Sequence, residues 1–156
     1  MTLRVLIVDD EPLARSRLRR LVGECTEPAA EVVAEAANAT EALQWLVRGP
    51  VDLALLDIHM PGVDGLKLAQ RLRERPDAPR VVFVTAHAQH ALQAFEVEAV
   101  DYLTKPVRQE RLQAALAKVQ RQLPARPAPE AVDEALLIQE RGRTERVPLA
   151  EVLYIK

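Results

Sequence analysis

The sequence predicts an α/β fold, a doubly wound five-stranded parallel sheet with helices on both faces. Short apolar runs alternate with amphipathic stretches through the first 123 residues, and this alternation is typical of parallel strands joined by helical crossovers. Several runs are almost wholly apolar, as strands buried on both faces are. The chain has 156 residues, of which 49% are hydrophobic, so it can form a packed core.

The first three strands and the two helices between them follow from apolar periodicity and from end signals. Pro12 suits the first turn of a helix, because its missing N–H would be unpaired there anyway. Asn38 or Thr40 can cap the next helix, and Gly49-Pro50 ends it. The expected elements are strand Leu3–Val8, helix Pro12–Glu24, strand Glu31–Ala36, helix Thr40–Arg48 and strand Val51–Leu56.

The remaining elements continue the same alternation. A loop with Gly62 leads into a helix at Gly65, and Pro106 separates the last strand from the last helix. The first, third and fourth strands are the most apolar, so we expect them at the centre of the sheet. The expected elements are helix Gly65–Glu74, strand Arg80–Val84, helix Gln89–Glu96, strand Val97–Leu103 and helix Val107–Gln122.

Charge and cysteine content exclude several classes of protein. The formal charge is −2, which gives no general argument for nucleic-acid binding. Cys25 is the single cysteine, so no internal disulfide is possible, and this fits a reducing compartment. No segment approaches the length of a membrane span. We therefore expect a soluble, cytoplasmic protein without membrane contact. We expect Arg15, Arg17, Arg19 and Arg20 to form a solvated face of the first helix.

Polar residues follow four of the five predicted strands. Asp9 and Asp10 follow the first, Asp57 the third, Thr85 the fourth and Lys105 the fifth. Ligands of doubly wound sheets bind at the carboxyl ends of the strands. We therefore expect these five side chains to converge on one edge of the sheet.

This set of side chains suits phosphoryl transfer. Three carboxylates make an oxygen-rich site of the kind that Mg²⁺ prefers, and one of them can attack phosphorus. A lysine and a metal can neutralise the transferring group. Alternatively, Asp9 and Asp10 only cap the first helix, Lys105 is a surface lysine, and Thr85 merely ends a strand.

The motifs VDDEP, LLDIHMPGVDG, FVTAHA and DYLTKP resemble those of response-regulator receiver domains, which accept phosphoryl groups from sensor histidine kinases. The resemblance covers residues 1–123 and implies a flavodoxin-like fold. It implies that Asp57 is the phospho-acceptor. It also implies that Mg²⁺ binds to Asp10 directly, to Asp9 mainly through water, to Asp57 and to the backbone carbonyl of His59.

The resemblance assigns roles to further residues. Thr85 and Lys105 match the switch hydroxyl and the lysine of the family, and Tyr102 matches its switch aromatic. Pro106 matches a proline that often follows a cis bond. His59 and His87 occupy positions that influence the lifetime of the phosphoryl group, although they could equally be ordinary loop histidines.

The C-terminal part has a different composition. Residues 124–132 are rich in Pro and Ala and read as a linker. Residues 133–156 alternate apolar and polar residues around Gly142, which is a hairpin signal with arms Leu137–Glu140 and Glu145–Leu149. This segment is similar to the start of LytTR-type DNA-binding domains. The resemblance implies that DNA is reached only through parts of that output domain that this chain lacks.

The sequence therefore predicts a phosphorylation-activated response regulator that is a phospho-acceptor and not an enzyme. Its expected partners are a cognate sensor histidine kinase and, on activation, a second copy of itself. One alternative is a Mg²⁺ phosphohydrolase, but such enzymes usually carry an acid where His59 stands. Another is a binding module without phosphorylation, although this chain lacks neither the acids nor the lysine. A Rossmann nucleotide site is not expected, since no GxGxxG follows the first strand.

Overall fold

The computed structural model describes residues 2–60, 62–86 and 98–123. Contacts divide the chain into two units, Met1–Leu123 and Pro124–Lys156, and all described residues belong to the first. The predicted helix Gln89–Glu96, His87, the linker and the C-terminal β segment therefore lie outside the described residues.

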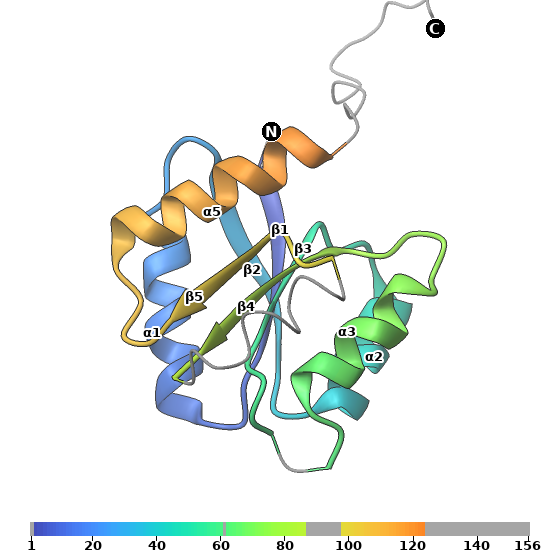
Figure 1. The fold of residues 1–156 in the computed structure, drawn as a ribbon. Coiled ribbons are helices and arrows are strands. Elements are labelled where there is room, and N and C mark those ends of the chain that lie inside the picture. Colours follow the sequence, from blue (N-terminus) through green and yellow to red (C-terminus); the bar gives the residue numbers. More distant parts are fainter. Residues whose placement is uncertain (1, 61, 87–97, 124–156) are drawn as a thin grey trace, which may run out of the picture. The chain divides into compact units, whose positions relative to one another are not determined.

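The described strands form one parallel sheet in the order β2-β1-β3-β4-β5 (Figure 1). This order confirms the predicted fold class and places the three most apolar strands at the centre. Each neighbouring pair is parallel. The strands are β1 (Thr2–Val8), β2 (Ala29–Ala36), β3 (Leu53–Leu56), β4 (Arg80–Thr85) and β5 (Asp101–Thr104).

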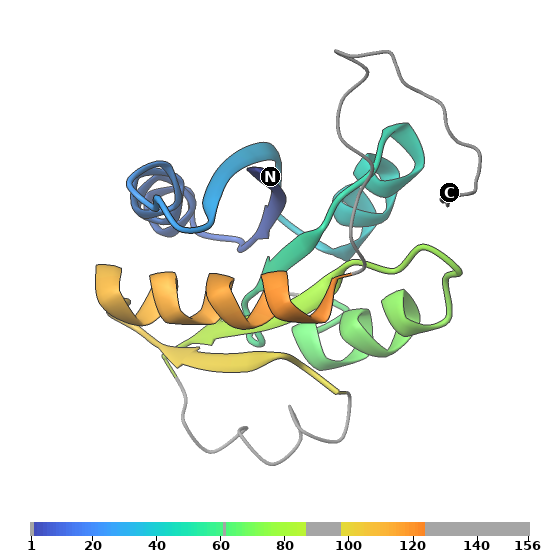
Figure 2. The same ribbon diagram turned by 90° about the horizontal axis from the view of Figure 1, so that it is seen from above.

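Helices cover both faces of the sheet, α1 and α5 on one side and α2 and α3 on the other (Figure 2). Side chains alternate along β1 accordingly: Val5 and Ile7 belong to the core under α1 and α5, and Leu6 and Val8 belong to the opposite core. The helices are α1 (Pro12–Gly23), α2 (Ala39–Arg48), α3 (Gly65–Arg73) and α5 (Gln109–Gln122).

The helix ends confirm the predicted cap Asn38 and show that the cap of α1 is neither Asp9 nor Asp10. Asn38 caps α2, and its side chain accepts a hydrogen bond from the Glu41 N–H at 2.9 Å. The N-cap of α1 is Glu11, without a side-chain cap bond. Asp9 and Asp10 are therefore not the N-cap residue of this helix, which leaves them for the edge of the sheet.

Three elements begin later than periodicity predicts. β3 starts at Leu53 and not at Val51, because the Asp52 carboxylate binds the Arg4 backbone N–H and guanidinium. α5 starts at Gln109, while Val107 is buried just before it. β5 starts at Asp101. In each case a polar or buried side chain has a tertiary contact that an apolar run alone does not reveal.

Candidate functional site

β1 and β3 place Asp9 and Asp57 side by side. The two strands are neighbours, with Val8 opposite Leu56, so the residue after each strand lies at the same edge. The Asp57 N–H donates to the Val8 carbonyl at 2.9 Å, and the Asp9 N–H donates to the Ala36 carbonyl at 3.0 Å. The backbone of both acids is therefore fixed by the sheet itself.

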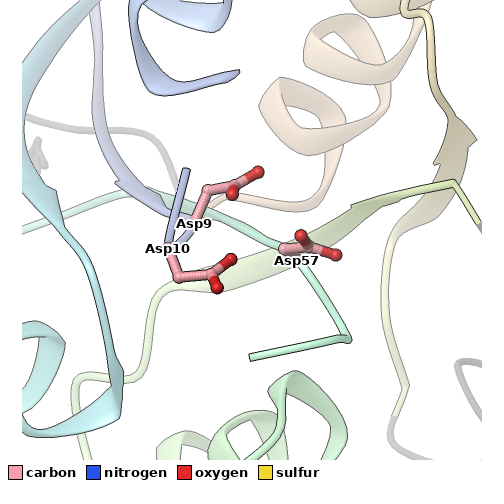
Figure 3. A group of neighbouring side chains, drawn as sticks. All are labelled: Asp9, Asp10 and Asp57. Carbon is pink, nitrogen blue, oxygen red and sulfur yellow. The ribbon is translucent and has the colours of Figure 1, made fainter. Parts of the chain in front are cut away.

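The three predicted carboxylates lie together at this edge (Figure 3). One oxygen of each lies within 4.8 Å of the others. Asp9 is 1% exposed and Asp57 is 8% exposed, whereas Asp10 is exposed. Two charged groups are thus buried, and such groups need a compensating charge.

Lys105 supplies a compensating charge. Its Nζ donates to Asp9 Oδ2 at 2.8 Å and to Asp57 Oδ2 at 3.3 Å. Its backbone N–H donates to the Thr85 carbonyl at 2.8 Å, which anchors the residue to the end of β4. The Lys105–Pro106 bond is cis, as predicted from the motif. The ammonium group therefore bridges the carboxylates that follow β1 and β3.

The pKa values reflect this shared charge. Burial raises the pKa of Asp57, and the negative charge of Asp9 raises it further, while Lys105 and the His59 N–H act in the opposite direction without cancelling the effect. Burial acts to lower the pKa of Lys105, but its bonds and charge interactions with Asp9 and Asp57 prevail and raise it. One ammonium thus serves two acids, and Asp57 is only partly compensated.

The loop after β3 holds the acceptor candidate through backbone contacts. The His59 N–H donates to Asp57 Oδ1 at 3.2 Å, and the Gly65 N–H donates to the Ile58 carbonyl at 2.9 Å. A Cβ at Gly65 would lie 2.2 Å from the Asp57 carbonyl oxygen. Only glycine allows this approach, so Gly65 belongs to the support of the site, a role that sequence analysis did not assign.

The other predicted site residues occupy varied surroundings. Thr85 ends β4 and is fully buried. Tyr102 is half-buried, and its ring lies 6.5 Å from that of Phe83 with a tilt of 55°. His59 is exposed, and His87 lies outside the described residues. The switch and lifetime roles of these residues stay predictions.

Arg15 corrects one expectation. It was expected on a solvated face of α1, but its side chain is only 18% exposed. Its Nη1 donates to the backbone carbonyl of Asp9 at 2.6 Å. Arginine side chains in a helix point back toward the N-terminus, which is the signal that could have predicted this contact.

The donor set fits Mg²⁺. Carboxylate oxygens are its preferred protein ligands, and two oxygens on opposite sides of one ion are about 4.2 Å apart, twice the usual Mg–O distance. The 4.8 Å limit at this cluster is only slightly longer. Small side-chain movements, or one ligand acting through water, would therefore complete such a site.

Comparison with known proteins agrees with this geometry. The family model for the response regulator receiver domain matches residues 5–117. The "Positive alginate biosynthesis regulatory protein" of Pseudomonas aeruginosa is 46% identical over 166 residues, covering 97% of this chain and 64% of that protein. The "Sensory transduction protein LytR" of Staphylococcus haemolyticus is 40% identical over 121 residues, covering 78% and 46%. The chain thus spans roughly half to two thirds of these relatives.

Solved structures show the same fold. The response regulatory domain of protein mrkE from Klebsiella pneumoniae superposes with a TM-score of 0.68 and 37% identity, covering 76% of this chain and 96% of that one. Response regulator TrrA from Thermotoga maritima, solved in complex with Mg²⁺-BeF, gives 0.64 and 31%, covering 75% and 98%. Within the described ranges, no helix is long and apolar enough to cross a membrane.

Proposed function

Because this chain belongs to the response-regulator receiver family, we propose that it accepts a phosphoryl group from a sensor histidine kinase onto Asp57, with Mg²⁺. The observation that carries the proposal is the convergence of three carboxylates and one ammonium on a single edge of the sheet. These groups come from three separate loops, those after β1, β3 and β5, so chance is a poor explanation for their convergence.

Asp57 is the nucleophile in this proposal. One of its oxygens forms a bond to phosphorus while the bond from phosphorus to the kinase's histidine nitrogen breaks, and the electron pair leaves with the imidazole. Among the described residues, the hydrogen bonds to the Asp57 oxygens are long, at 3.2 Å from the His59 N–H and 3.3 Å from Lys105 Nζ. These weak bonds orient the carboxylate without holding its electron pairs as strongly as short bonds would.

The two remaining acids differ in a way that supports separate roles. The Asp9 carboxylate already accepts bonds from Lys105 and from the Glu11 N–H at 2.9 Å. Asp10 is exposed. Asp10, Asp57 and the His59 carbonyl would hold Mg²⁺ directly, and Asp9 mainly through water. Bound Mg²⁺ would supply positive charge to the oxygens of the transferring group.

Lys105 has a second task after transfer. Phosphorylation adds roughly one and a half to two negative charges, and the ammonium lies 3.3 Å from the oxygen that faces it. Thr85 would donate its hydroxyl to the new group, and Tyr102 would turn inward. The face formed by the helix expected at Gln89–Glu96, β5 and α5 would then favour pairing with a second copy.

The relatives suggest a regulatory role for the longer protein. Two of them are named as a biosynthesis regulator and as a sensory transduction protein called LytR. The alignment with the alginate regulator covers 97% of this chain, so it extends past residue 123. We propose that residues 133–156 begin a LytTR-type output domain, and that the longer protein regulates transcription by binding DNA.

The phosphohydrolase alternative finds little support at this site. Such an enzyme needs a general acid beside the nucleophile. The residue two positions after Asp57 is His59, which is exposed. We therefore infer a phospho-acceptor with slow self-dephosphorylation, and expect almost no turnover of p-nitrophenyl phosphate.

Intact-mass spectrometry after incubation with acetyl phosphate tests the proposal. We expect one phosphoryl adduct that requires Mg²⁺ and is absent from Asp57→Asn. The absence of an adduct on folded wild-type protein would overturn the proposal and favour a binding module that works without phosphorylation.

A further inference from the structure

The exposed acid of the cluster depends on its backbone for its direction. Asp9 is held by Lys105 and by the Glu11 N–H. No hydrogen bond or ion pair joins the Asp10 carboxylate to any other described residue. The direction in which the Asp10 side chain leaves the main chain is therefore set by the backbone, including the peptide unit that precedes it, whose carbonyl belongs to Asp9.

Arg15 fixes that peptide unit. Its Nη1 donates to the Asp9 carbonyl at 2.6 Å, a short bond strengthened by the charge of the donor. On the strand side, the Asp9 N–H is tied to the Ala36 carbonyl of β2 at 3.0 Å. The backbone at Asp9 is thus held from α1 and from β2, and the Asp9–Asp10 peptide plane has little freedom to rotate.

Glu35 in turn orients Arg15. Its carboxylate forms an ion pair with Arg15, with 3.3 Å between Glu35 Oε1 and Arg15 Nε, and it accepts a hydrogen bond from Arg19 Nε. Its backbone carbonyl accepts from the Trp45 indole N–H at 3.0 Å. Glu35 therefore receives contacts from α1 and α2 while it lies in β2, and the Arg15 side chain, 18% exposed, contacts both the Glu35 carboxylate and the Asp9 carbonyl.

We propose that Arg15 is a positioning residue for Mg²⁺: it holds the Asp9–Asp10 peptide so that the Asp10 carboxylate meets the ion. The inference rests on the proposed function, since it assumes that the ion binds at this cluster. Groups that hold a metal ligand without touching the metal commonly change affinity 10- to 100-fold when mutated.

Electrostatics alone predicts the opposite change in Mg²⁺ affinity when Arg15 is replaced, which makes the proposal testable. Arg15 is a cation beside a cation site, so removing only its charge would strengthen Mg²⁺ binding. Removing its hydrogen bond to Asp9 would weaken binding if the peptide must be held. Arg15→Met removes both the charge and the hydrogen bond while keeping much of the side-chain volume. Whether Mg²⁺ affinity rises or falls in this variant therefore shows which effect is larger.

The test is calorimetric titration of Mg²⁺ into the full chain. We expect Arg15→Met to weaken binding by roughly tenfold, and Arg15→Lys, which retains one donor, to restore part of the loss. Arg19→Met is the matched control: it removes the same charge from the same Glu35, but Arg19 is 54% exposed and has no bond to Asp9. We expect the Mg²⁺ affinity of Arg19→Met to equal that of the wild type or to be slightly higher.

A second readout separates positioning from general damage. In phosphorylation by acetyl phosphate, Arg15→Met should need more Mg²⁺ for half-maximal rate, while its rate at saturating Mg²⁺ stays within about twofold of wild type. Arg15→Lys carries the test if Arg15→Met fails to fold, because it keeps the positive charge. A loss of Mg²⁺ affinity in Arg15→Lys therefore comes from the altered bond to Asp9 and not from a change of charge.

The outcomes are distinct. Unchanged or tighter Mg²⁺ binding in Arg15→Met, or in Arg15→Lys where Arg15→Met does not fold, with a binding wild type, overturns the positioning role and leaves the phospho-acceptor function intact. A wild type that binds no Mg²⁺ overturns both. Equal weakening in Arg19→Met would also overturn the role, because it would trace the effect to the loss of a Glu35 contact and not to the Asp9 contact.

Discussion

The close approach of Gly65 to the backbone of Asp57 and Ile58, in the loop after β3, gives the sharpest test of the described geometry. A methyl group at this position would lie 2.2 Å from the Asp57 carbonyl oxygen, and 2.9 Å from both the Asp57 carbonyl carbon and Ile58 Cα. Real Cβ contacts essentially never fall below 3.0 Å and ordinary ones begin at 3.4 Å, so the nearest gap must widen by at least 0.8 Å, and by 1.2 Å to reach an ordinary contact. All three obstacles are backbone atoms, which a rotamer change cannot move.

The expected cost of Gly65→Ala follows from two opposing effects. Forcing extra atoms into a packed region costs about 1–3 kcal/mol, and backbone obstacles place this case at the upper end. Alanine has a better helix propensity by up to about 1 kcal/mol, at the first residue of α3. We expect the free energy of unfolding to fall by about 2 kcal/mol, measured by urea titration.

The same substitution should impair phosphorylation. Widening the gap displaces the backbone at Asp57, and a shift of about 1 Å in a reacting group can reduce a rate by roughly 100-fold. We expect the acetyl phosphate reaction to slow by roughly tenfold or more. Gly23→Ala is the control, because a Cβ there meets nothing within 4 Å; it should be neutral or slightly stabilising. A Gly65→Ala protein with stability within about 0.5 kcal/mol of wild type and an unchanged rate would refute the reasoning.

Three further substitutions test the charges, each by urea unfolding against pH. Burial raises the pKa of Asp57 in the folded protein, so ionising this carboxyl at neutral pH destabilises the fold. Asp57→Asn should therefore have a higher free energy of unfolding than wild type at neutral pH. This difference in free energy should vanish as pH falls toward 3.8, the pKa of the carboxyl in the unfolded chain. Lys105→Met leaves Asp9 and Asp57 without their shared cation, and it should lower the free energy of unfolding by about 2 kcal/mol at neutral pH. This is less than the loss for a fully buried pair, because Lys105 is partly exposed. A loss of stability that is the same at every pH would contradict this explanation. Although burial acts to raise it, bonds from Arg111 and neighbouring donors lower the pKa of Asp101 to about 2. Asp101→Asn should therefore cost about 1 kcal/mol, discounted because Arg111 is 46% exposed, and the loss should disappear as pH falls from 3.8 through about 2.

The three central strands and the edge that carries the site could be predicted because both depend on local chemistry. Wholly apolar runs such as Leu53–Leu56 must be buried on both faces, which places β3 at the centre. The residues directly after such strands must then meet at one edge. Asp9, Asp57 and Lys105 do so, and no long-range information was needed to expect them together.

The supporting residues could not be found in the same way. Periodicity places Arg15 on the polar side of α1, and the general direction of helical side chains toward the N-terminus does not by itself identify the Asp9 carbonyl as the group that its guanidinium meets. Gly65 looks like an ordinary loop glycine until the Asp57 carbonyl is placed against it. Both roles arise from how α1 and α3 sit on the sheet, and tertiary packing of this kind is not encoded in a hydrophobic pattern.

The charge at the site explains why a divalent cation suits it. Three ionised carboxylates and one ammonium leave a formal charge of −2, three negative charges less one positive. Lys105 is shared between two buried acids, so burial still raises the pKa of Asp57. A monovalent cation would leave the edge negative, and a phosphoryl donor, itself anionic, would be repelled. An ion of charge +2 would balance the cluster, and in the proposed function Lys105 would then lie beside the negative charge added at Asp57.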